Sequence, residues 1–304
     1  MVWETLKYKK EEINNAGKIL TSDKEADEQK LMAMEILNNW RSAHSYPMHI
    51  FQMTLKKKSQ DVDKKSLVSQ RLKRVPAIIY KLMRKYNGRR PSMKLYQMQD
   101  IGGCRAVLSN VALAKKLYNE EYLRGDLKHK LVNKKDYISE PKTDGYRSLH
   151  LVYEYKSDKG KEKFNGLLTE IQIRSKLQHL WATAVETAGF FTRQAIKSNE
   201  GPEWIDFFRL VSSAFAKTEE CPCVPDTPGD EKELYSQIKN KERELKVIDK
   251  MKAWTSAMRY FEQKIKAKTK KKAKFFLLEL DIVGEKLNIT EYAEKEEEKA
   301  IGEY

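Results

Sequence analysis

Apolar residues recur at helical spacing through the first 70 residues of the chain. Leu31, Met34, Leu37 and Trp40 follow one another at intervals that place them along one side of a helix. Ile36 also belongs to this apolar set, in a segment rich in Lys, Glu, Asn and Met. The pattern predicts that the chain begins with helices.

The segment 75–86 shows the same spacing and carries signals for both helix ends. Val75 and Leu82 lie along one side of the expected helix. Pro76 suits the first helical turn, where its missing N–H costs no hydrogen bond, and Gly88 suits the C-terminal cap. We expect a helix from about residue 75 to residue 86.

Short runs of strand type follow this helix. They span residues 105–109, 148–155 and 167–174. The polar, glycine-containing connection between the second and third runs is typical of a hairpin. Helical patterns flank the strands near 110–124 and 175–196. A mixed sheet with helices packed on it, of the α+β or α/β class, is therefore expected over roughly residues 40–220.

Prolines mark a boundary after this domain. Residues 221–230 hold three of the eight prolines in the chain, a composition typical of a linker. A helical pattern of Lys and Glu over 231–272 then leads into an apolar run that starts at Phe275 and that we expect to pair on a sheet. The predicted parts are an N-terminal helical region (1–67), a central domain (68–220), and a linker with a charged helical extension that contains one strand (221–304).

Composition adds a positive charge to this picture. The 304 residues carry 59 Lys and Arg against 44 Asp and Glu, which gives a net charge of +15. Hydrophobic residues make up 40% of the chain, which is enough to bury a globular core. The charge favours polyanionic partners such as nucleotides, RNA or acidic proteins, although a solvated lysine-rich surface has the same composition.

The sequence points to a cytoplasmic location. No apolar run reaches the ~20 residues that a membrane-spanning helix needs, and the N-terminal residues lack the apolar stretch of a secretory signal. Cys104, Cys221 and Cys223 form no CxxC pair, so neither a disulfide framework nor a zinc site is indicated.

Several common catalytic motifs are missing. The sequence has no G-x-x-x-x-G-K-[ST] loop, no G-x-G-x-x-G, no H-E-x-x-H and no G-x-S-x-G. None of the five histidines is followed by Asp, so the HD motif of metal-dependent phosphohydrolases is missing too. Four polar clusters near the predicted elements remain as candidates for chemistry.

The first cluster is cationic and precedes the helix that begins near Pro76. Its members are Arg71, Lys73, Arg74 and Lys81. Free N–H groups at a helix N-terminus, together with nearby cations, can cradle a polyphosphate. A basic amphipathic surface helix is the alternative interpretation.

The second cluster is built on Asp100, which precedes a Gly-Gly turn and a strand that starts at Arg105. A carboxylate at a strand margin is well placed to ligate Mg²⁺, which proteins usually bind through one or two carboxylates plus substrate phosphates. An aspartate in an ordinary turn is the alternative.

The third cluster is a turn over residues 141–145 that leads into a strand. Lys142 lies in the turn, and Tyr146 and His150 follow it. A tyrosine among cations suits a nucleobase platform, because the ring stacks on a base while the cations hold phosphates. A plain hairpin is the alternative.

The fourth cluster is a strand with one polar face. With a period of two, Glu170, Gln172 and Arg174 share one face, while Ile171 and Ile173 share the other. Such a face is either exposed to solvent or lines an active-site cleft, where Glu170 would be a second metal ligand or a proton acceptor.

Taken in this order, the four clusters resemble the synthetase domain of the RelA/SpoT family, the ribonucleotide pyrophosphokinases that make ppGpp and pppGpp. The resemblance covers about residues 68–190. The motifs that carry it are Arg71-x-Lys73-x-x-x-x-Ile78-x-x-Lys81, Asp100-x-x-Gly103-x-Arg105, Asp136-Tyr137-Ile138, Pro141-Lys142, Gly145-Tyr146-x-Ser148-Leu149-His150 and Glu170-x-Gln172-Ile173-Arg174.

The resemblance implies an α+β, nucleotidyltransferase-like fold. This fold is a mixed, mainly antiparallel sheet flanked by helices, here with N-terminal helices and a C-terminal extension. Two departures stand out: Ala77 replaces the serine that the family usually has in its first motif, and the segment around Glu186 differs from the long enzymes. Because the hydrolase half is missing, the chain resembles a small, synthetase-only member, some of which act as toxins.

The resemblance also implies roles for the polar residues. ATP would bind along Arg71, Lys73, Lys81 and Arg105. Mg²⁺ would be held by Asp100 and Glu170, and catalysis would involve Glu170, Gln172 and Asp100. The acceptor nucleotide would contact Lys142, Tyr146, Ser148, His150 and Arg174.

The implied reaction transfers the β,γ-pyrophosphate of ATP to the 3′-OH of GDP or GTP, which makes the chain a GTP/GDP diphosphokinase. Two alternatives remain open. One is modification of the 3′-terminal adenosine of tRNA, which the seven lysines between Lys264 and Lys274 favour. The other is a catalytically silent RNA-binding or regulatory module on the same fold. A second copy of the chain, an antitoxin or another regulatory protein are further possible partners.

Overall fold

The structure is a computed structural model that describes residues 3–84, 93–192, 202–268, 275–281 and 286–292. The chain forms two compact units, Met1–Lys241 and Glu242–Tyr304, which are described separately. The domain boundaries predicted at residues 68 and 221 stay predictions.

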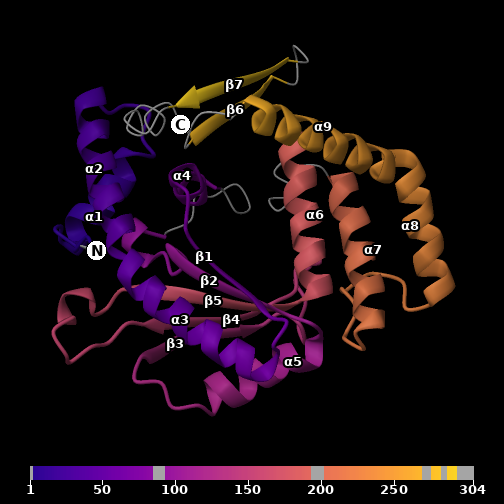
Figure 1. Cartoon of the computed structure of the whole chain (residues 1–304), viewed down its shortest axis with the longest axis horizontal. Coiled ribbons are helices and arrows are strands. Elements are labelled where there is room, and N and C mark those ends of the chain that lie inside the picture. The colour runs from indigo at the N-terminus through magenta and orange to yellow at the C-terminus, as the bar shows by residue number, and fades with distance from the viewer. Residues whose placement is uncertain (1–2, 85–92, 193–201, 269–274, 282–285, 293–304) are drawn as a thin grey trace. The chain divides into compact units, whose positions relative to one another are not determined.

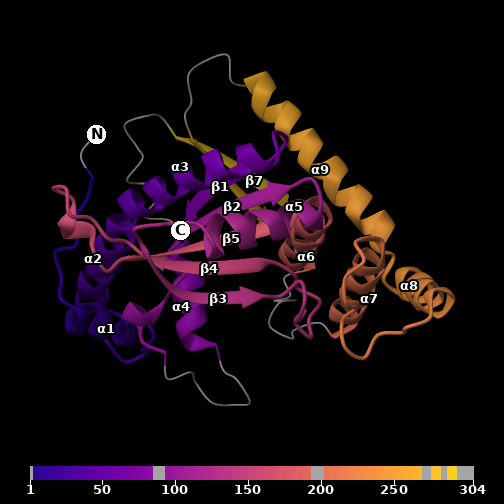
Figure 2. The ribbon, with the colours of Figure 1, turned by 90° about the horizontal axis from the view of Figure 1, so that it is seen from below.

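The first unit contains a five-stranded sheet with the strand order β1-β2-β5-β4-β3, which Figure 2 shows side by side. The strands are β1 (Leu67–Leu72), β2 (Gly102–Leu108), β3 (Lys130–Asp136), β4 (Leu149–Glu154) and β5 (Leu168–Ser175). β2 and β5 are parallel, and the β1–β2, β4–β5 and β3–β4 pairs are antiparallel. The predicted mixed, mainly antiparallel sheet is confirmed.

The two edge strands, β1 and β3, were not predicted from the sequence. β1 reads LVSQRL and β3 reads KLVNKKD, and most of their side chains are at least partly exposed. Edge strands that face solvent lack the apolar alternation on which strand prediction depends. The predicted Gly-Gly turn is wrong for a related reason: Gly102 and Gly103 lie inside β2, where they pair with β1 and β5.

One face of the sheet is apolar and carries the main core. Cys104 and Ala106 of β2 and Ile171 and Ile173 of β5 are buried there. Helix α3 (Ser45–Val62) covers them, and so does α5 (Val111–Lys116) with the π-helical turn η2 (Leu117–Leu123) (Figure 1). Because alternate residues of a strand point to opposite faces, the polar side chains of β2 and β5 are left on the other face.

A second core joins the N-terminal helices to the segments around Asp100. Helices α1 (Lys10–Ile19) and α2 (Asp27–Ala43) confirm the predicted helical start of the chain. Leu37 and Trp40 of α2 pack with Ile78 of α4 (Val75–Met83) and with Ile101, which follows the short 3-10 helix η1 (Leu95–Gln97). Pro76 lies in the first turn of α4, as predicted, whereas Gly88 lies outside the described residues.

Helices α6 (Lys176–Thr192), α7 (Pro202–Thr218) and α8 (Glu231–Leu245) follow the sheet. A reciprocal cap starts α6 directly after β5, because the Gln178 N–H donates to Ser175 Oγ and the Ser175 N–H donates to Gln178 Oε1. The predicted hairpin between β4 and β5 is confirmed and contains the 3-10 helix η3 (Glu162–Phe164). The predicted linker 221–230 lies within the first unit and is hydrogen-bonded to α7 through Ser213.

The second unit consists of the end of α8, helix α9 (Val247–Lys268), and the strands β6 (Phe275–Asp281) and β7 (Lys286–Tyr292). The apolar run from Phe275 forms a strand, as predicted, and pairs antiparallel with β7, a second strand in a part of the chain where the sequence predicts only one. The lysines over 269–274 lie outside the described residues. Among the helices that the structure describes, none is both long enough and apolar enough to cross a bilayer.

Candidate active site

Two rows of mostly polar residues cross the face of the sheet opposite the core. Directly paired residues of neighbouring strands point to the same face, so the strand register defines each row. The first row is Ser69, Arg105, Gln172, His150 and Lys135. The second row is Arg71, Gly103, Glu170, Val152 and Asn133.

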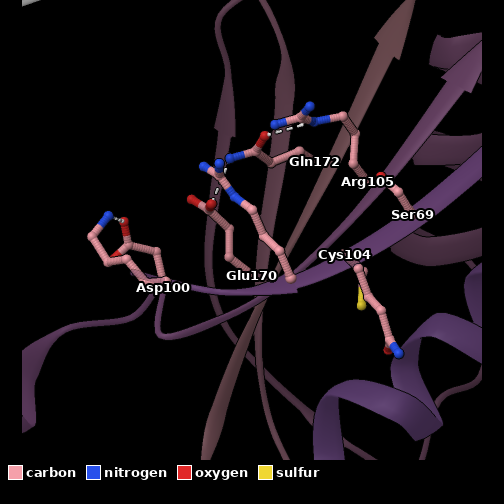
Figure 3. Close-up of a pocket in the computed structure, with 10 residues that line it drawn as sticks. Ser69, Asp100, Cys104, Arg105, Glu170 and Gln172 are labelled. Atoms are coloured by element: carbon pink, nitrogen blue, oxygen red, sulfur yellow. Dashed lines mark hydrogen bonds and ion pairs between the residues drawn. The ribbon is translucent and has the colours of Figure 1, made fainter. Parts of the chain in front are cut away.

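A pocket opens over the β1–β2–β5 side of these rows. Figure 3 shows Glu170, Gln172 and Arg105 on the pocket side of the strands and Asp100 beside them, whereas Cys104 points toward the opposite side. The lining residues are Ser69, Gln70, Arg71, Lys73, Asp100, Gly103, Cys104, Arg105, Glu170 and Gln172. Six of the predicted site residues therefore lie together.

A second pocket lies on the β3–β4 side of the same face. It is lined by Gln99, Asn133, Lys134, Lys135, Tyr137, His150, Val152 and Glu170. Glu170 borders both pockets, so its carboxylate lies where a group in one pocket would meet a group in the other. Lys134 and Lys135 were not predicted as site residues, because β3 has no apolar alternation. Tyr137 was named only as a member of the Asp136-Tyr137-Ile138 motif.

Asp100 is held by two lysines from different segments. Lys73 Nζ lies 2.8 Å from Asp100 Oδ2, and Lys81 Nζ lies 2.9 Å from Asp100 Oδ1. Burial by itself would raise the pKa of the Asp100 carboxyl, but the charges and hydrogen bonds of Lys81 and Lys73 outweigh it, so the pKa lies below its usual value. Asp100 is thus a carboxylate with a cation on each oxygen.

Glu170 is held by one neutral side chain, Gln172, and by His150. His150 Nδ1 lies 2.9 Å from Glu170 Oε1, and Gln172 Nε2 donates to Glu170 Oε2 at 2.7 Å. Burial would raise the pKa of the Glu170 carboxyl, but the hydrogen bond and charge of His150 and the hydrogen bond from Gln172 lower it further than burial raises it. Glu170 is therefore ionised at neutral pH.

A closed ring of hydrogen bonds connects Glu170 to Arg174. Arg174 donates to the Tyr146 hydroxyl at 2.6 Å and to Gln172 Oε1 at 2.8 Å. The Tyr146 hydroxyl lies 2.8 Å from His150 Nε2. Because the Glu170 carboxylate can only accept, His150 donates to it from Nδ1. Hydrogen bonds therefore lead from Arg174 to Glu170 along two paths.

Like charges crowd the centre of the sheet face. Arg105 donates to Gln172 Oε1 at 3.4 Å. Burial lowers the pKa of Arg105, and the nearby positive charges of Arg174 and Arg71 lower it further. Burial and the charges of Arg105 and Arg174 also lower the pKa of His179 on α6, a residue that the sequence analysis missed. Such a concentration of cations favours an anionic ligand.

Cations lie over the ring of Tyr146. Lys142 Nζ is 5.1 Å from the ring centroid, and Arg174 Cζ is 5.0 Å from it. Lys142 Nζ also lies 4.5 Å from the centroid of Tyr137. The predicted nucleobase platform is thus covered by cations, which a base would have to displace or join.

Ser148 is placed differently from the other predicted acceptor residues. Its side chain is fully buried, where its hydroxyl donates to the Ile173 carbonyl at 3.2 Å and accepts from Arg174 Nε at 3.4 Å. Ser148 therefore supports Arg174 from within the core.

The segment that holds these residues is similar to known proteins. The family model described as "Region found in RelA / SpoT proteins" matches residues 70–191, which include every predicted site residue. The GTP pyrophosphokinase YjbM of Bacillus subtilis strain 168 is 35% identical over 121 residues, 38% of this chain and 52% of YjbM. YwaC of the same strain, also a GTP pyrophosphokinase, is 34% identical over 113 residues, 37% of this chain and 52% of YwaC. The chain thus spans about half the length of these relatives.

A solved structure shows the same fold. The small alarmone synthetase 1 from Bacillus subtilis, crystallised with its product pppGpp, superposes with a TM-score of 0.51 at 23% identity, over 61% of this chain and 94% of the other. The α+β fold class predicted from the sequence is confirmed. The family match thus identifies residues 70–191 as a region of the kind found in RelA/SpoT proteins, and the solved structure shows the same fold.

Proposed function

We propose that the chain is a ribonucleotide pyrophosphokinase that transfers the β,γ-pyrophosphate of ATP to the 3′-OH of GDP or GTP and releases AMP. The observation that carries this proposal is the position of Glu170 on the border of two pockets, one rich in cations and one lined by Tyr137 and His150. The names of the two GTP pyrophosphokinase relatives support it.

ATP binds in the cationic pocket in this proposal. Arg71, Lys73 and Arg105 line that pocket, and Lys81 reaches Asp100 at its edge. Guanidinium and ammonium groups are the side chains that bind phosphate oxygens most strongly. The triphosphate would draw Lys73 and Lys81 away from Asp100, because a phosphate chain carries more negative charge than one carboxylate.

Asp100 and Glu170 fit a Mg²⁺ ion that is shared with the substrate. Both line the same pocket, and each carboxylate oxygen has a second lone pair beyond the hydrogen bonds described above. Proteins usually hold Mg²⁺ through one or two carboxylates together with substrate phosphates. When bound, Mg²⁺ would neutralise charge on the phosphates and on the departing AMP.

The acceptor binds in the second pocket and presents its 3′-OH to the β-phosphorus. His150 lines this pocket. Lys142 and Tyr146, which lie beside the pocket residue Tyr137, would help to hold the base and phosphates of the acceptor. A bond forms from the 3′-oxygen to the β-phosphorus, while the bond from that phosphorus to the α,β-bridging oxygen breaks and AMP leaves with the oxygen. Glu170 orients the hydroxyl and takes its proton, which then passes to solvent. Alignment of the reactants and electrostatic stabilisation supply most of the acceleration.

Labelled ATP tests this proposal directly. Purified protein is incubated with [γ-³²P]ATP, Mg²⁺ and either GDP, GTP or total tRNA, and the products are separated by thin-layer chromatography and gel electrophoresis. Label in a guanosine nucleotide, with equimolar AMP, is the expected result. Label in tRNA would show that the acceptor is tRNA and not a guanosine nucleotide. If ATP is consumed with none of the acceptors, the catalytically silent module is favoured.

A matched pair of variants ties the activity to the site. Glu170→Gln should reduce the transfer rate by about 10²-fold or more. Glu154→Gln, on the neighbouring strand β4 and paired with Lys130 at 3.9 Å, should retain it. Equal activity of the two variants would contradict the proposed role of Glu170.

A further inference from the structure

We propose that helix α7, which lies outside the segment 70–191 that matches the family, positions the acceptor turn through Ser212. The acceptor turn is defined here as residues 141–146. The inference rests on the proposed function in one respect, namely that the ligand bound at this turn is the acceptor nucleotide. Ser212 is a positioning residue in this proposal and does not touch the ligand.

The acceptor turn is held internally by short-range hydrogen bonds. The Gly145 N–H donates to the Lys142 carbonyl at 2.9 Å, and the Lys142 N–H donates to the Tyr146 carbonyl at 3.2 Å. The Tyr146 N–H donates to Asp144 Oδ1 at 2.9 Å. These bonds define the shape of the turn but not its place on the sheet.

Ser212 supplies an anchor between the turn and α7. Its hydroxyl donates to the Gly145 carbonyl at 2.6 Å and accepts from Arg147 Nε at 3.1 Å. The Ser212 side chain is 2% exposed, so water cannot easily replace it as the donor. Arg147 extends the anchor, because it also donates to the carbonyls of Ile138 and Pro222.

Close packing leaves the turn little freedom against the helices. Gly145 has a φ of +91°, and a Cβ there would lie 2.9 Å from Trp181 Cζ2 on α6 and 3.1 Å from Ser212 Cβ. It would also lie 3.3 Å from Arg209 Cα, in the backbone of α7. The Gly145 peptide is therefore seated directly on α7.

Displacement of this peptide would act on the acceptor side of the site alone. Tyr146 follows Gly145 in the chain, and Lys142 Nζ lies over its ring. Lys73 and Asp100, on the ATP side, make no contact with Ser212 among the hydrogen bonds and ion pairs described for them. Loss of the anchor should therefore weaken acceptor binding and leave ATP binding unchanged.

The chain offers a matched control at the next residue of α7. Ser213 is also buried, but its hydroxyl accepts from the Val224 N–H at 2.9 Å and lies 2.8 Å from Thr227 Oγ1. It thus anchors the segment after α7 and not the acceptor turn. Ser212→Ala and Ser213→Ala remove the same group from neighbouring buried positions.

The test measures KM for GDP or GTP, KM for ATP, and hydrogen exchange of residues 141–146 by mass spectrometry in the full chain. Ser212→Ala should raise the acceptor KM about three- to tenfold, the equivalent of one lost hydrogen bond, and should speed exchange in the turn. The KM for ATP should not change. Ser213→Ala should leave the acceptor KM and turn exchange as in the wild type, and Ser212→Thr, which keeps the hydroxyl, should restore both.

Two outcomes would overturn the proposal. One is an equal acceptor KM in Ser212→Ala and Ser213→Ala, and the other is unchanged exchange of the turn in Ser212→Ala. If the wild type transfers pyrophosphate to no nucleotide, the proposed function fails, whereas the exchange measurement still decides whether Ser212 anchors the turn. A melting temperature for each variant separates local loosening from global unfolding.

Discussion

Arg174 is joined to Glu170 by two separate hydrogen-bonded paths on the polar face of the sheet. One path runs through Tyr146 and His150, and the other runs through Gln172. Both paths begin at the buried guanidinium of Arg174 and end at the carboxylate of Glu170. The arrangement keeps the Glu170 carboxylate ionised and aimed at the border of the two pockets.

Removal of one path should raise the pKa of Glu170. His150→Ala takes away a hydrogen bond and a charge that lower this pKa, while burial, which raises it, remains. Carboxyl ¹³C NMR titration should therefore show Glu170 taking up its proton at higher pH in His150→Ala than in the wild type. Gln172→Ala should move the pKa in the same direction. The control is His129→Ala, because the His129 ring stacks on Tyr155 and not on Glu170; this variant should leave the pKa of Glu170 unchanged. An unchanged Glu170 pKa in His150→Ala would contradict the hydrogen bond from His150 to Glu170.

Metal binding should depend on the two lysines that hold Asp100. In the free protein a divalent cation must compete with both ammonium groups, so Mn²⁺ alone should bind weakly. The double change Lys73→Met and Lys81→Met should strengthen the binding of Mn²⁺ alone by about tenfold or more, since two adjacent positive charges are removed. Electron paramagnetic resonance of free Mn²⁺ measures this affinity.

Lys58→Met provides the control for that experiment, because Lys58 pairs with Glu121 at 3.0 Å outside the pocket. Addition of Asp100→Asn to the double variant should abolish the gain. The proposal of a shared metal site would be wrong if the double variant bound Mn²⁺ no better than the Lys58 variant does.

Stability should fall with acidification because of His44. This residue is 2% exposed, its Nδ1 lies 2.8 Å from the Trp40 carbonyl, and burial lowers its pKa to about 4. The unfolded chain binds a proton near the ordinary value of about 6.5, so protons favour unfolding. The stability present above that value is lost as pH falls toward 4, to a total of about 3 kcal/mol.

Urea unfolding at a series of pH values between 7.5 and 4.5 measures this effect. His44→Asn, which keeps a donor near the position of Nδ1, should be less stable at pH 7.5 but should show a flatter dependence on pH. Parallel curves for the variant and the wild type would exclude His44 as the source.

Gly145→Ala should destabilise the protein more than Gly160→Ala. Both glycines have positive φ, +91° and +72°, so each substitution costs about 1 kcal/mol or more of backbone strain. At Gly145 the new Cβ also meets Trp181 and α7, whereas at Gly160 it meets no atom within 4 Å. Denaturant unfolding should therefore show a larger loss for Gly145→Ala, and equal losses would contradict the close packing of the acceptor turn.

Much of the candidate site follows from local pattern alone. The alternation in β5 places Glu170, Gln172 and Arg174 on one face, and the structure confirms this because a strand has a side-chain period of two wherever it pairs. The helix that begins near Pro76 is local for a similar reason, since helical periodicity and the first-turn proline depend only on neighbouring residues.

Local pattern does not predict the edge strands, nor the contacts between residues that are far apart in the sequence. β1 and β3 are polar edge strands, and neighbouring strands within the sheet specify them more than their own pattern does. The parallel pairing of β2 with β5 brings Arg105 to Gln172 across 67 residues of sequence. No spacing rule predicts such a pair, because it depends on the order in which strands join the sheet.

The sequence by itself therefore determined which residue types are available, which of them share a strand face, and the family to which residues 70–191 are similar. Only the tertiary structure decided that Asp100 is neutralised by two lysines, that Glu170 borders both pockets, and that α7 seats the acceptor turn. The physical reason is that these contacts join segments far apart in the chain. Their geometry is set by how the sheet and helices pack, which periodicity within any one segment does not encode.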